Sequence, residues 1–546
     1  MDNIYRKGIL NYWLINYIEG GGKPKWKTFE HNGVMFPPKY IKKNIPILYD
    51  GKELLLDEVN EEIAFLYAKY LGSDYVKNPT FNKNFWKDWR QILGKNHTIQ
   101  NFDLLDFSKM KQYLTDCSEK NKTCEKYKQE KEENKKISEK FSIAYLDGQE
   151  QPVGNFRMEP PGIFLGRGKN PNLGKIKKRI LPEDIIINIG KGAKIPEPQI
   201  GNNHNHKWGK IIHDRTVEWL ASWKDSVTGK IKYVWLGSCS ILKSDSDRFK
   251  FDLAKKLKKK IRSIRTKNDE NLHSSDKTLR QTATALYFVD RHALRVGNEK
   301  GKNEADTVGV TSLRVEHITF NDNNTITLDF LGKDSVRYFN KIKVDPIIYV
   351  NLLEFTEKKE KYENVFDLIN SNNVNKYLQN FMKDLTAKVF RTYNASNIFQ
   401  KELDKLNSEI IKNPNMKEQL ILDEYTRANA KVAKIMNHQK NISKSYKEQL
   451  SRIDDSIKKI KKQINKAKNS DTIKKLQERL KEKKSKKIAK KDLKNISLDT
   501  SKVNYIDPRI TFAFLKKHKI PIEKVLSKTL IKKFEWASNV DEFYVF

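Results

Sequence analysis

The spacing of apolar residues along the first half of the chain predicts both helices and strands. Residues 53–71 have the period of a helix packed on one face, whereas residues 119–140 are so highly charged that a solvated helix is predicted. From residue 155 to residue 242 the pattern becomes that of strands, with residues 217–223 and 230–236 on either side of a turn. We therefore expect mixed α and β structure in this half.

The second half of the chain is mostly helical in its spacing, with one predicted hairpin. Ile326, Leu328 and Phe330 alternate with polar residues up to a glycine, and the alternation resumes beyond it, which predicts a β-hairpin over residues 325–340. The predicted helices are residues 252–266, 277–295, 375–406 and 417–437. Residues 501–546 are apolar and aromatic, so we expect a compact end to the chain.

A narrow apolar seam in a basic background distinguishes residues 441–496. Residues 469–472 interrupt this seam with side chains that favour helix starts. The seam positions are Tyr446, Leu450, Ile453, Ile457, Ile460 and Ile464 before the break, and Ile473, Leu476 and Leu480 after it. Steps of three and four residues predict an antiparallel coiled-coil hairpin.

The charge balance indicates a class of partner. The chain has 546 residues, with 106 Lys and Arg against 69 Asp and Glu and a net charge of +37. Nucleic acid is the leading partner, because cationic side chains displace the counterions condensed on phosphates; an anionic membrane surface is the weaker alternative. For residues 441–496 two roles stay open, a solvated spacer and an arm held near DNA phosphates.

Composition excludes several classes of protein. A hydrophobic fraction of 38% is ample for a folded core. No stretch of about 18 apolar residues predicts a membrane-spanning helix, and residues 1–20 lack the pattern of a signal peptide. The three cysteines, Cys117, Cys124 and Cys239, have no zinc-site spacing and form no disulfide framework, which predicts a reduced, intracellular protein without a Cys/His metal centre.

Two cationic residues stand out in ordered contexts, although each has an ordinary structural explanation. Arg295 lies near the end of an apolar helix just before Gly297, where it can direct its guanidinium at a phosphate or simply complement the helix dipole. Lys333 lies at the tip of the predicted hairpin, where it can enter a DNA groove or merely add solubility.

Further candidates lie later in the chain. Lys388 and Arg391 are three residues apart and are expected to share a helix face. His438 closes a predicted helix, a position in which histidine is usually structural. Tyr505 precedes an Asp-Pro pair, which is a helix-start signature, and a tyrosine there usually serves packing.

In combination these segments are far more specific than any is alone. Their order along the chain and their amino-acid sequences resemble those of the eukaryotic nuclear type IB DNA topoisomerases. The resemblance extends from about Trp26 to Phe546. The core segments are residues 284–300, 331–335, 385–394, 437–440 and 501–510, with further matches at 159–162, 182–188, 305–309, 312–317 and 536–546.

The resemblance implies a covalent mechanism. Tyr505 would attack a DNA phosphate and form a 3′-phosphotyrosyl bond. Arg295 and Arg391 would neutralise the non-bridging oxygens and favour the phenolate. His438 would donate a hydrogen bond to one of those oxygens, and Lys333 would protonate the departing 5′-oxygen. Because the covalent bond conserves the energy of the phosphodiester, neither ATP nor a metal is expected as a cofactor.

The resemblance also implies a set of DNA-binding residues, most of which should meet phosphates. They are Arg167, Trp219, Lys232, Tyr233, Lys250, Arg295, Val296, Gly297, Asn298, Glu299, Lys300, Thr307, Thr386, Ala387 and Lys388. Asp334 and Asn504 are also predicted DNA-binding residues, and because they match the camptothecin pocket of the family, drug sensitivity is a hypothesis. The sequence departs from the family at Leu165, where an arginine is usual, at an apparent insertion over residues 202–205, and in the shortness of residues 441–496.

The implied fold class is an α+β multidomain DNA clamp. Its expected parts are a mixed α/β N-terminal lobe (1–240), a mainly helical catalytic lobe of the tyrosine recombinase and type IB topoisomerase fold (241–440), the antiparallel coiled-coil linker (441–496) and a small helical C-terminal domain (497–546). We expect a monomer that acts on supercoiled double-stranded DNA. A nuclear location is expected, for which the basic run at residues 481–491 is a weak signal.

Two rival functions remain to be weighed. A tyrosine site-specific recombinase shares the fold and the covalent step, but such enzymes typically have His-x-x-Arg where this chain has Lys388-Val-Phe-Arg391. They also need sequence-specific sites and partner protomers. A non-catalytic, basic DNA-binding or chromatin protein would account for the charge but not for the five matching segments, so within that class only a catalytically inactive homologue stays open.

Overall fold

The computed structural model describes residues 20–200, 205–301, 304–440, 442 and 445–546. The prediction that residues 1–20 are not a signal peptide therefore falls outside the described residues except at Gly20. The apparent insertion over residues 202–205 also falls outside them except at Asn205. The chain divides into two compact units. The N-terminal unit comprises residues 1–246 and 300–306, and the C-terminal unit comprises residues 247–299 and 307–546.

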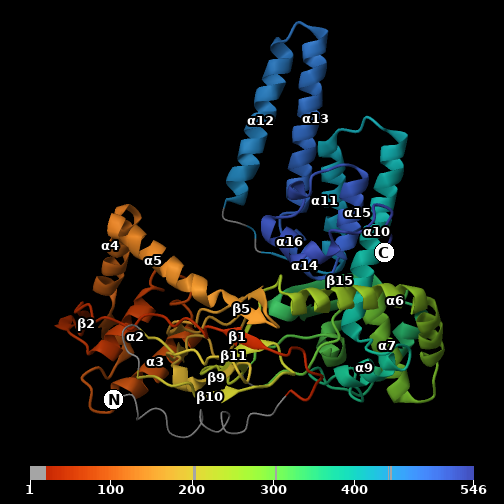
Figure 1. The fold of residues 1–546 in the computed structure, drawn as a ribbon. Coiled ribbons are helices and arrows are strands. Elements are labelled where there is room, and N and C mark those ends of the chain that lie inside the picture. The colour runs from red at the N-terminus through yellow and green to blue at the C-terminus, as the bar shows by residue number, and fades with distance from the viewer. Residues whose placement is uncertain (1–19, 201–204, 302–303, 441, 443–444) are drawn as a thin grey trace. The chain divides into compact units, whose positions relative to one another are not determined.

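Small sheets make up much of the N-terminal unit (Figure 1). Their strands are β1 (Phe29–His31), β2 (Ile47–Tyr49), β3 (Lys52–Leu54), β4 (Leu105–Asp106), β5 (Ile143–Leu146), β6 (Gln149–Pro152), β7 (Gly162–Ile163), β8 (Ile176–Lys177), β9 (Ile185–Asn188), β10 (Lys210–Ile212), β11 (Trp219–Lys224) and β12 (Ile231–Trp235). The four-stranded sheet has the order β10-β9-β11-β12, with β9 and β10 parallel and the other pairs antiparallel. The two strands predicted around residues 225–229 are thus confirmed as β11 and β12.

The helices of the N-terminal unit begin and end at recognisable signals. They are α2 (Glu58–Ala68), α3 (Pro79–Leu93), α4 (Ser108–Thr123) and α5 (Glu125–Phe141), with 3-10 turns η1 (Phe102–Leu104) and η2 (Pro182–Asp184). Asp57 caps α2 by accepting a hydrogen bond from the Asn60 N–H at 2.9 Å. The single charged helix predicted over residues 119–140 is instead split between α4 and α5, because Cys124 has extended backbone with ψ of 117°.

The C-terminal unit contains one three-stranded antiparallel sheet and many helices. The strands are β13 (Ile318–Asn321), β14 (Thr325–Leu331) and β15 (Arg337–Lys343), and the helices are α6 (Ile241–Asn271, beginning in the N-terminal unit), α7 (Lys277–Arg291), α8 (Pro346–Thr356), α9 (Ser371–Gln379), α10 (Ala387–Lys412), α11 (Glu418–Ile435), α12 (Tyr446–Lys466), α13 (Ser470–Asp492), α14 (Leu498–Asn504), α15 (Pro508–Lys517) and α16 (Lys528–Lys533). The 3-10 turns are η3 (Val310–Ser312), η4 (Val315–His317), η5 (Lys333–Ser335), η6 (Ile522–Lys524) and η7 (Glu535–Ala537).

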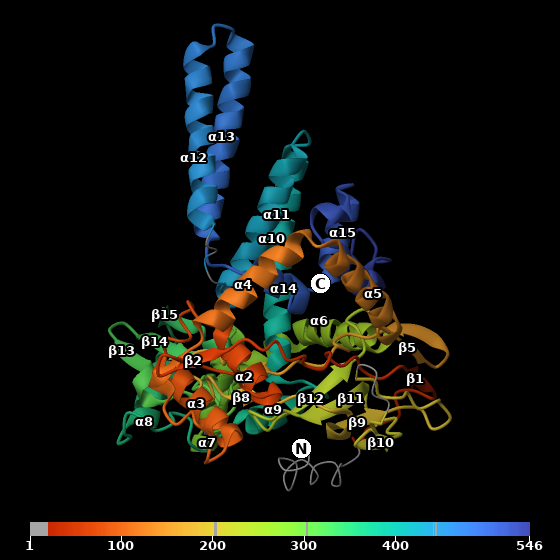
Figure 2. The same cartoon turned by 90° about the vertical axis from the view of Figure 1, so that its left-hand side faces the viewer.

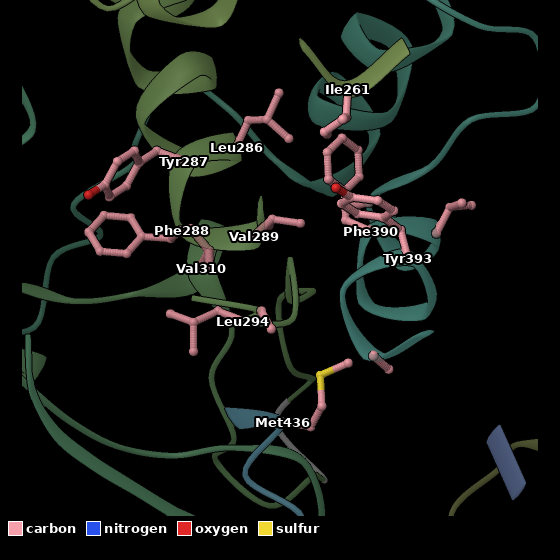
Figure 3. Close-up of a cluster of buried hydrophobic side chains, with 14 of the residues drawn as sticks. Ile261, Leu286, Tyr287, Phe288, Val289, Leu294, Val310, Phe390, Tyr393 and Met436 are labelled. Atoms are coloured by element: carbon pink, nitrogen blue, oxygen red, sulfur yellow. The ribbon is translucent and has the colours of Figure 1, made fainter. Parts of the chain in front are cut away.

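The core of the C-terminal unit lies where α7 packs against α10. Phe288 of α7 and Phe390 of α10 are both fully buried, and Met436 beyond α11 joins the same cluster (Figure 3). Burial of side chains this large contributes about 1.5–3 kcal/mol each. Because α10 and the end of α11 also carry candidate site residues, this packing fixes the elements that support them.

Two sequence predictions in this unit need correction. The helix predicted to reach residue 295 ends at Arg291, because Ala293 adopts a left-handed φ of 52° and the Leu294 N–H turns back to the Phe288 carbonyl at 3.2 Å. The helix predicted over residues 375–406 is two helices, α9 and α10, and Thr386 with extended backbone precedes the second.

The hairpin and the helical pair are confirmed as elements. Phe330 pairs with Tyr338 across β14 and β15, as the alternation of apolar residues predicts. Helices α12 and α13 lie side by side as an antiparallel pair (Figures 1 and 2). Ile460 and Leu476 of the predicted seam are only 4% and 9% exposed. Over the residues described, no helix combines the length and apolar character needed to cross a membrane.

Candidate active site

Arg295 lies on an irregular segment after α7. Gly297 has a φ of 88°, and a Cβ added there would lie 2.6 Å from the Cα of Gly309. Because the two backbones approach this closely, the Val310 N–H donates to the Arg295 carbonyl at 2.9 Å. Arg295 is therefore carried on a backbone that is tied to a second segment.

Lys333 lies at the tip of the β14–β15 hairpin, as predicted. The Gly332 N–H donates to the Val336 carbonyl at 2.8 Å, which closes the turn. Within it Asp334 and Ser335 adopt left-handed φ values of 66° and 57°. The side chain of Lys333 is exposed, so the turn presents a cation on a defined backbone.

Arg391 is buried within α10, and main-chain carbonyls hold its guanidinium. The residue is 4% exposed. Its Nη atoms donate to the carbonyl of Ala293 and, at 3.2 Å, to that of Met436, whereas its Nε has no partner among the described residues. Lys388, three residues earlier on the same helix, is exposed.

His438 is positioned by the way in which α11 ends. Asn437 adopts a left-handed φ of 52°, a conformation that asparagine tolerates. The His438 N–H then donates to the Ala433 carbonyl at 2.9 Å and the Asn437 N–H to the Lys434 carbonyl at 3.0 Å, the two bonds of a Schellman motif. The imidazole that follows is 4% exposed, and its Nδ1 lies 2.7 Å from Ser501 Oγ.

Tyr505 directly follows α14 as its C-cap residue, and a side chain of α10 holds its backbone. Ser396 Oγ donates to the Tyr505 carbonyl at 3.1 Å and accepts from the Asp507 N–H at 3.0 Å. Asp507 is fully buried and caps α15 by accepting from the Arg509 N–H at 3.0 Å, so the predicted helix start is confirmed.

These segments bring all five candidate catalytic residues together in the C-terminal unit. The Tyr505 ring stacks on the His438 imidazole with centroids 5.1 Å apart, and the guanidinium carbon of Arg391 lies 5.0 Å from the Tyr505 ring centroid. A cavity of about 120 Å³ is lined by Arg295, Lys333, Arg391 and His438. Tyr505 is not part of the lining but contacts three of the residues that form it, Arg295, Arg391 and His438.

Burial and neighbouring charges shift the pKa values of three residues of this cluster in different ways. Burial opposes ionisation of the Tyr505 phenol, but the charges of Arg391 and Arg295 and their hydrogen bonds to it outweigh burial, so its pKa lies below the usual value. Burial, with repulsion from Arg295, lowers the pKa of Arg391 to about 10, and Arg391 therefore stays charged at neutral pH. Burial, with repulsion from Arg391 and Arg295, lowers the pKa of His438 to about 3, which leaves a neutral imidazole.

This combination can bind an anion beside a nucleophile. Two guanidinium groups and an imidazole can stabilise developing negative charge, and a phenol of lowered pKa can attack a neighbouring phosphorus. Across the residues that are described, no group of three or more His, Cys, Asp or Glu side chains is arranged to hold a metal ion.

The predicted DNA-binding residues of the C-terminal unit lie around this cluster in different environments. Thr386 and Ala387 begin α10, where the Ala387 N–H already donates to Asn375 Oδ1 at 3.0 Å. Lys250 pairs with Asp247 at 3.0 Å, and burial lowers its pKa. The exposed ones are Asn298, Glu299, Asp334, Lys388 and Asn504, while Val296, Gly297 and Thr307 are half-buried.

The remaining predicted DNA-binding residues belong to the N-terminal unit. Arg167 and Lys300 are exposed. Lys232 lies 3.0 Å from carboxylate oxygens of Glu159 and Asp225. Trp219 is 4% exposed and packs on Tyr233, with ring centroids 5.5 Å apart. Leu165, the departure noted above, is 37% exposed.

Sequence reasoning missed the residues that support the cluster. Ser396 and Ser501 contact Tyr505 and His438 across sequence separations of 109 and 63 residues, and serines in helical segments carry no pattern that marks such contacts. From the sequence, Asp507 and Arg509 could be assigned only to the start of a helix. In the structure they form an ion pair of 2.8 Å, which buries a charge beside Tyr505.

Comparison with known proteins gives matches over nearly the whole chain. Residues 24–236 match the eukaryotic DNA topoisomerase I DNA-binding fragment, residues 239–471 the catalytic core of the same enzyme, and residues 477–546 the C-terminal topoisomerase domain.

Individual relatives agree. DNA topoisomerase 1 beta of Arabidopsis thaliana is 41% identical over 558 residues, which cover 96% of this chain and 60% of the relative. Human DNA topoisomerase 1 is 40% identical over 96% of this chain and 72% of its own length, and the Candidozyma auris enzyme is 37% identical over 98% and 85%. The chain thus spans about 60% of the length of the Arabidopsis relative. On these matches, the chain belongs to the eukaryotic DNA topoisomerase I family.

Proposed function

We propose that this protein is a type IB DNA topoisomerase, which relaxes supercoils by transient cleavage of one strand without ATP. The observation that carries the proposal is the position of Tyr505 between two complementary groups, with the Arg391 guanidinium carbon 5.0 Å from its ring centroid and the His438 ring 5.1 Å away. A tyrosine placed only for packing does not need a lowered pKa, yet the pKa of Tyr505 is lowered although burial opposes it.

In the proposed reaction Tyr505 releases its phenol proton to solvent, and the phenolate Oη attacks a backbone phosphorus of duplex DNA. The Oη–P bond forms as the bond from phosphorus to the 5′-oxygen breaks, which leaves a 3′-phosphotyrosyl link. Arg295, Arg391 and His438 stabilise the charge on the non-bridging oxygens, and Lys333 donates the proton that the 5′-oxygen takes up. After the free end has rotated, the 5′-hydroxyl attacks the link and the same steps run in reverse.

The finer architecture belongs to the same proposal. The two units would close around the duplex as a clamp, with a catalytic region of the tyrosine recombinase type over residues 241–440. The antiparallel pair α12–α13 would be a coiled-coil linker that moderates strand rotation. The support is the match of the DNA-binding and catalytic-core models to residues 24–236 and 239–471, and the basic surface of the helical pair.

The test is relaxation of supercoiled plasmid in EDTA without ATP. Wild-type protein should relax the plasmid, and Tyr505→Phe should lose relaxation while still binding duplex DNA. Equal relaxation by both proteins would refute the assignment of the nucleophile. No relaxation by either would favour an inactive DNA-binding homologue, and exchange confined to one sequence would favour a recombinase.

Three further properties follow from family membership as proposals. The protein would act as a monomer and reside in the nucleus. A camptothecin-type inhibitor would bind at the cleavage complex near Asp334 and Asn504, both exposed. Drug that adds no covalent complex in a cleavage-trapping assay would contradict the last of these.

A further inference from the structure

A buried contact between His438 and Ser501 lies behind the cavity. His438 Nδ1 and Ser501 Oγ are 2.7 Å apart, with His438 4% exposed and Ser501 fully buried. The other ring nitrogen, His438 Nε2, is buried and has no hydrogen-bond partner among the described residues. The His438 side chain lines the cavity that Arg295, Lys333 and Arg391 also line.

Which nitrogen carries the proton decides what His438 can do. The pKa of His438 is lowered to about 3, chiefly by burial, so near neutral pH the imidazole has a single proton. With the proton on Nε2 it presents a donor to the cavity, and with the proton on Nδ1 it presents a lone pair there. A lone pair would repel a phosphate oxygen, whereas a donor stabilises it.

The surroundings of Ser501 favour one direction for the hydrogen bond. His438 Nδ1 is the hydrogen-bond partner of the hydroxyl within the described part of the chain. If Nδ1–H donated to Oγ, the hydroxyl hydrogen would be buried without an acceptor, at a cost of about 1–3 kcal/mol. If the hydroxyl donates to Nδ1, both groups are satisfied and the imidazole proton is left on Nε2.

We propose that Ser501 is a positioning residue, whose hydroxyl donates to His438 Nδ1 and thereby holds the Nε2–H tautomer that faces the scissile phosphate. This rests on the proposed function, because the phosphate is the group that the Nε2–H would meet. Ser501 lies in α14 four residues before Tyr505, the residue that caps the C-terminus of this helix, so one short segment supplies both the proposed nucleophile and the group that sets the tautomer of His438.

The first test uses wild-type protein and needs no substrate. Long-range ¹⁵N–¹H correlation spectra of histidine-labelled protein at pH 7, with His438→Gln to assign the resonance, should give His438 the Nε2–H pattern. An Nδ1–H pattern would overturn the proposal whether or not the protein cleaves DNA.

The second test is a double-mutant cycle in single-turnover cleavage of a suicide duplex. Ser501→Ala should slow cleavage by about tenfold or more, within the roughly 10²–10³-fold that loss of a whole oxyanion donor costs. Ser501→Thr, which keeps a hydroxyl, should recover part of the rate. In a His438→Gln background Ser501→Ala should have little further effect, because the two residues act as one group.

Thr511→Ala is the matched control. It also removes a buried hydroxyl with a 2.7 Å hydrogen bond, to Tyr425, but away from the cavity. It should leave the cleavage rate close to that of wild-type protein. The inference would be overturned if Ser501→Ala cleaved at the wild-type rate, or if the rate losses of Ser501→Ala and His438→Gln multiplied in the double mutant. Cleavage that still required Tyr505 would leave the proposed function standing in either case.

Discussion

At the scale of single residues, burial and the charges of two arginines combine differently in setting the pKa values of Tyr505 and His438. Burial alone would make Tyr505 harder to ionise, yet two guanidinium groups reverse the direction of its pKa shift. Burial, together with the same two charges, lowers the pKa of His438 to about 3 and keeps its imidazole neutral. The candidate nucleophile is thus made more acidic while its neighbour stays neutral, and both effects combine burial with the charges of Arg391 and Arg295.

Removing the Arg391 charge should therefore change the pH dependence of cleavage. In Arg391→Gln the pKa of Tyr505 should rise, because burial is then less opposed, and single-turnover cleavage at pH 7 should fall by roughly 10²–10³-fold. The rate should recover partly at higher pH. The exposed Lys405→Gln variant on the same helix should keep the wild-type profile. A profile of unchanged shape in Arg391→Gln would contradict the account of Tyr505.

A second residue-scale prediction concerns acid stability. Burial lowers the pKa of His31 to about 4, with its Nε2 2.9 Å from the Asn188 carbonyl. The unfolded chain takes up this proton near pH 6.5 and the folded chain near pH 4, so stability is present above pH 6.5 and lost as pH falls. His31 should contribute a loss of about 3 kcal/mol in the free energy of unfolding between those pH values.

Urea unfolding of the protein at a series of pH values measures this loss. His31→Gln, which can still donate to Asn188, should show a smaller fall in the unfolding midpoint between pH 6.5 and pH 4. The exposed His273→Gln variant should retain the wild-type slope. Equal slopes in all three proteins would exclude His31 as the source.

At the scale of elements, the ends of helices place the chemistry. The Schellman motif at the end of α11 delivers His438, the capped start of α15 fixes the chain beyond Tyr505, and the turn after α7 carries Arg295. These connections are a few residues long, so a small change in one of them would move a candidate catalytic side chain. The close approach of Gly297 and Gly309 is the tightest of them.

Gly309→Ala should disable the site. A Cβ at this position would lie 2.4 Å from the Cα of Gly297, so the backbone that carries Arg295 must shift. Cleavage should fall by about 10²-fold, the size of effect that misplacement by about 1 Å produces. Gly301→Ala is the control, because nothing lies within 4 Å of a Cβ there. Suicide-duplex cleavage measures both, and equal rates would refute a role for the Gly297–Gly309 contact.

Elements were predicted from the sequence more readily than their ends and contacts. The Ile326–Phe330 alternation predicted the hairpin and the tip position of Lys333, because a period of two depends on nearby residues alone. The end of α7 was placed four residues too late, at 295 rather than at Arg291, because apolar spacing continues through Leu294 although Ala293 leaves the helical conformation. The Ser501–His438 contact could not be predicted, because it joins residues 63 apart.

At the scale of the whole molecule, the net charge of +37 bears on binding strength. The cluster itself contributes few of the cations, so most of the electrostatic attraction must come from exposed lysines and arginines such as Arg167, Lys300 and Lys388. In the proposed function, contacts of these residues with phosphates would hold a duplex without selecting a sequence. Affinity should therefore depend steeply on salt, whereas the chemical step after binding should depend on it much less.

A salt titration of duplex binding tests whether phosphate contacts dominate the affinity. With Tyr505→Phe to prevent cleavage, affinity for a short duplex should fall by about 10³–10⁵-fold between 50 and 200 mM salt if 6–10 phosphates are neutralised. Arg167→Gln should reduce the slope of log affinity against log salt by about one. A slope near zero would contradict a phosphate-dominated interface.

The central claim is that Tyr505 is the residue that becomes bonded to DNA. The most direct measurement is to trap the protein on a suicide duplex, digest the adduct with protease and nuclease, and identify the modified peptide by mass spectrometry. The account predicts a nucleotide joined through its 3′-phosphate to Tyr505. Attachment at another residue or through a 5′-phosphate, or the absence of any adduct from active protein, would contradict it.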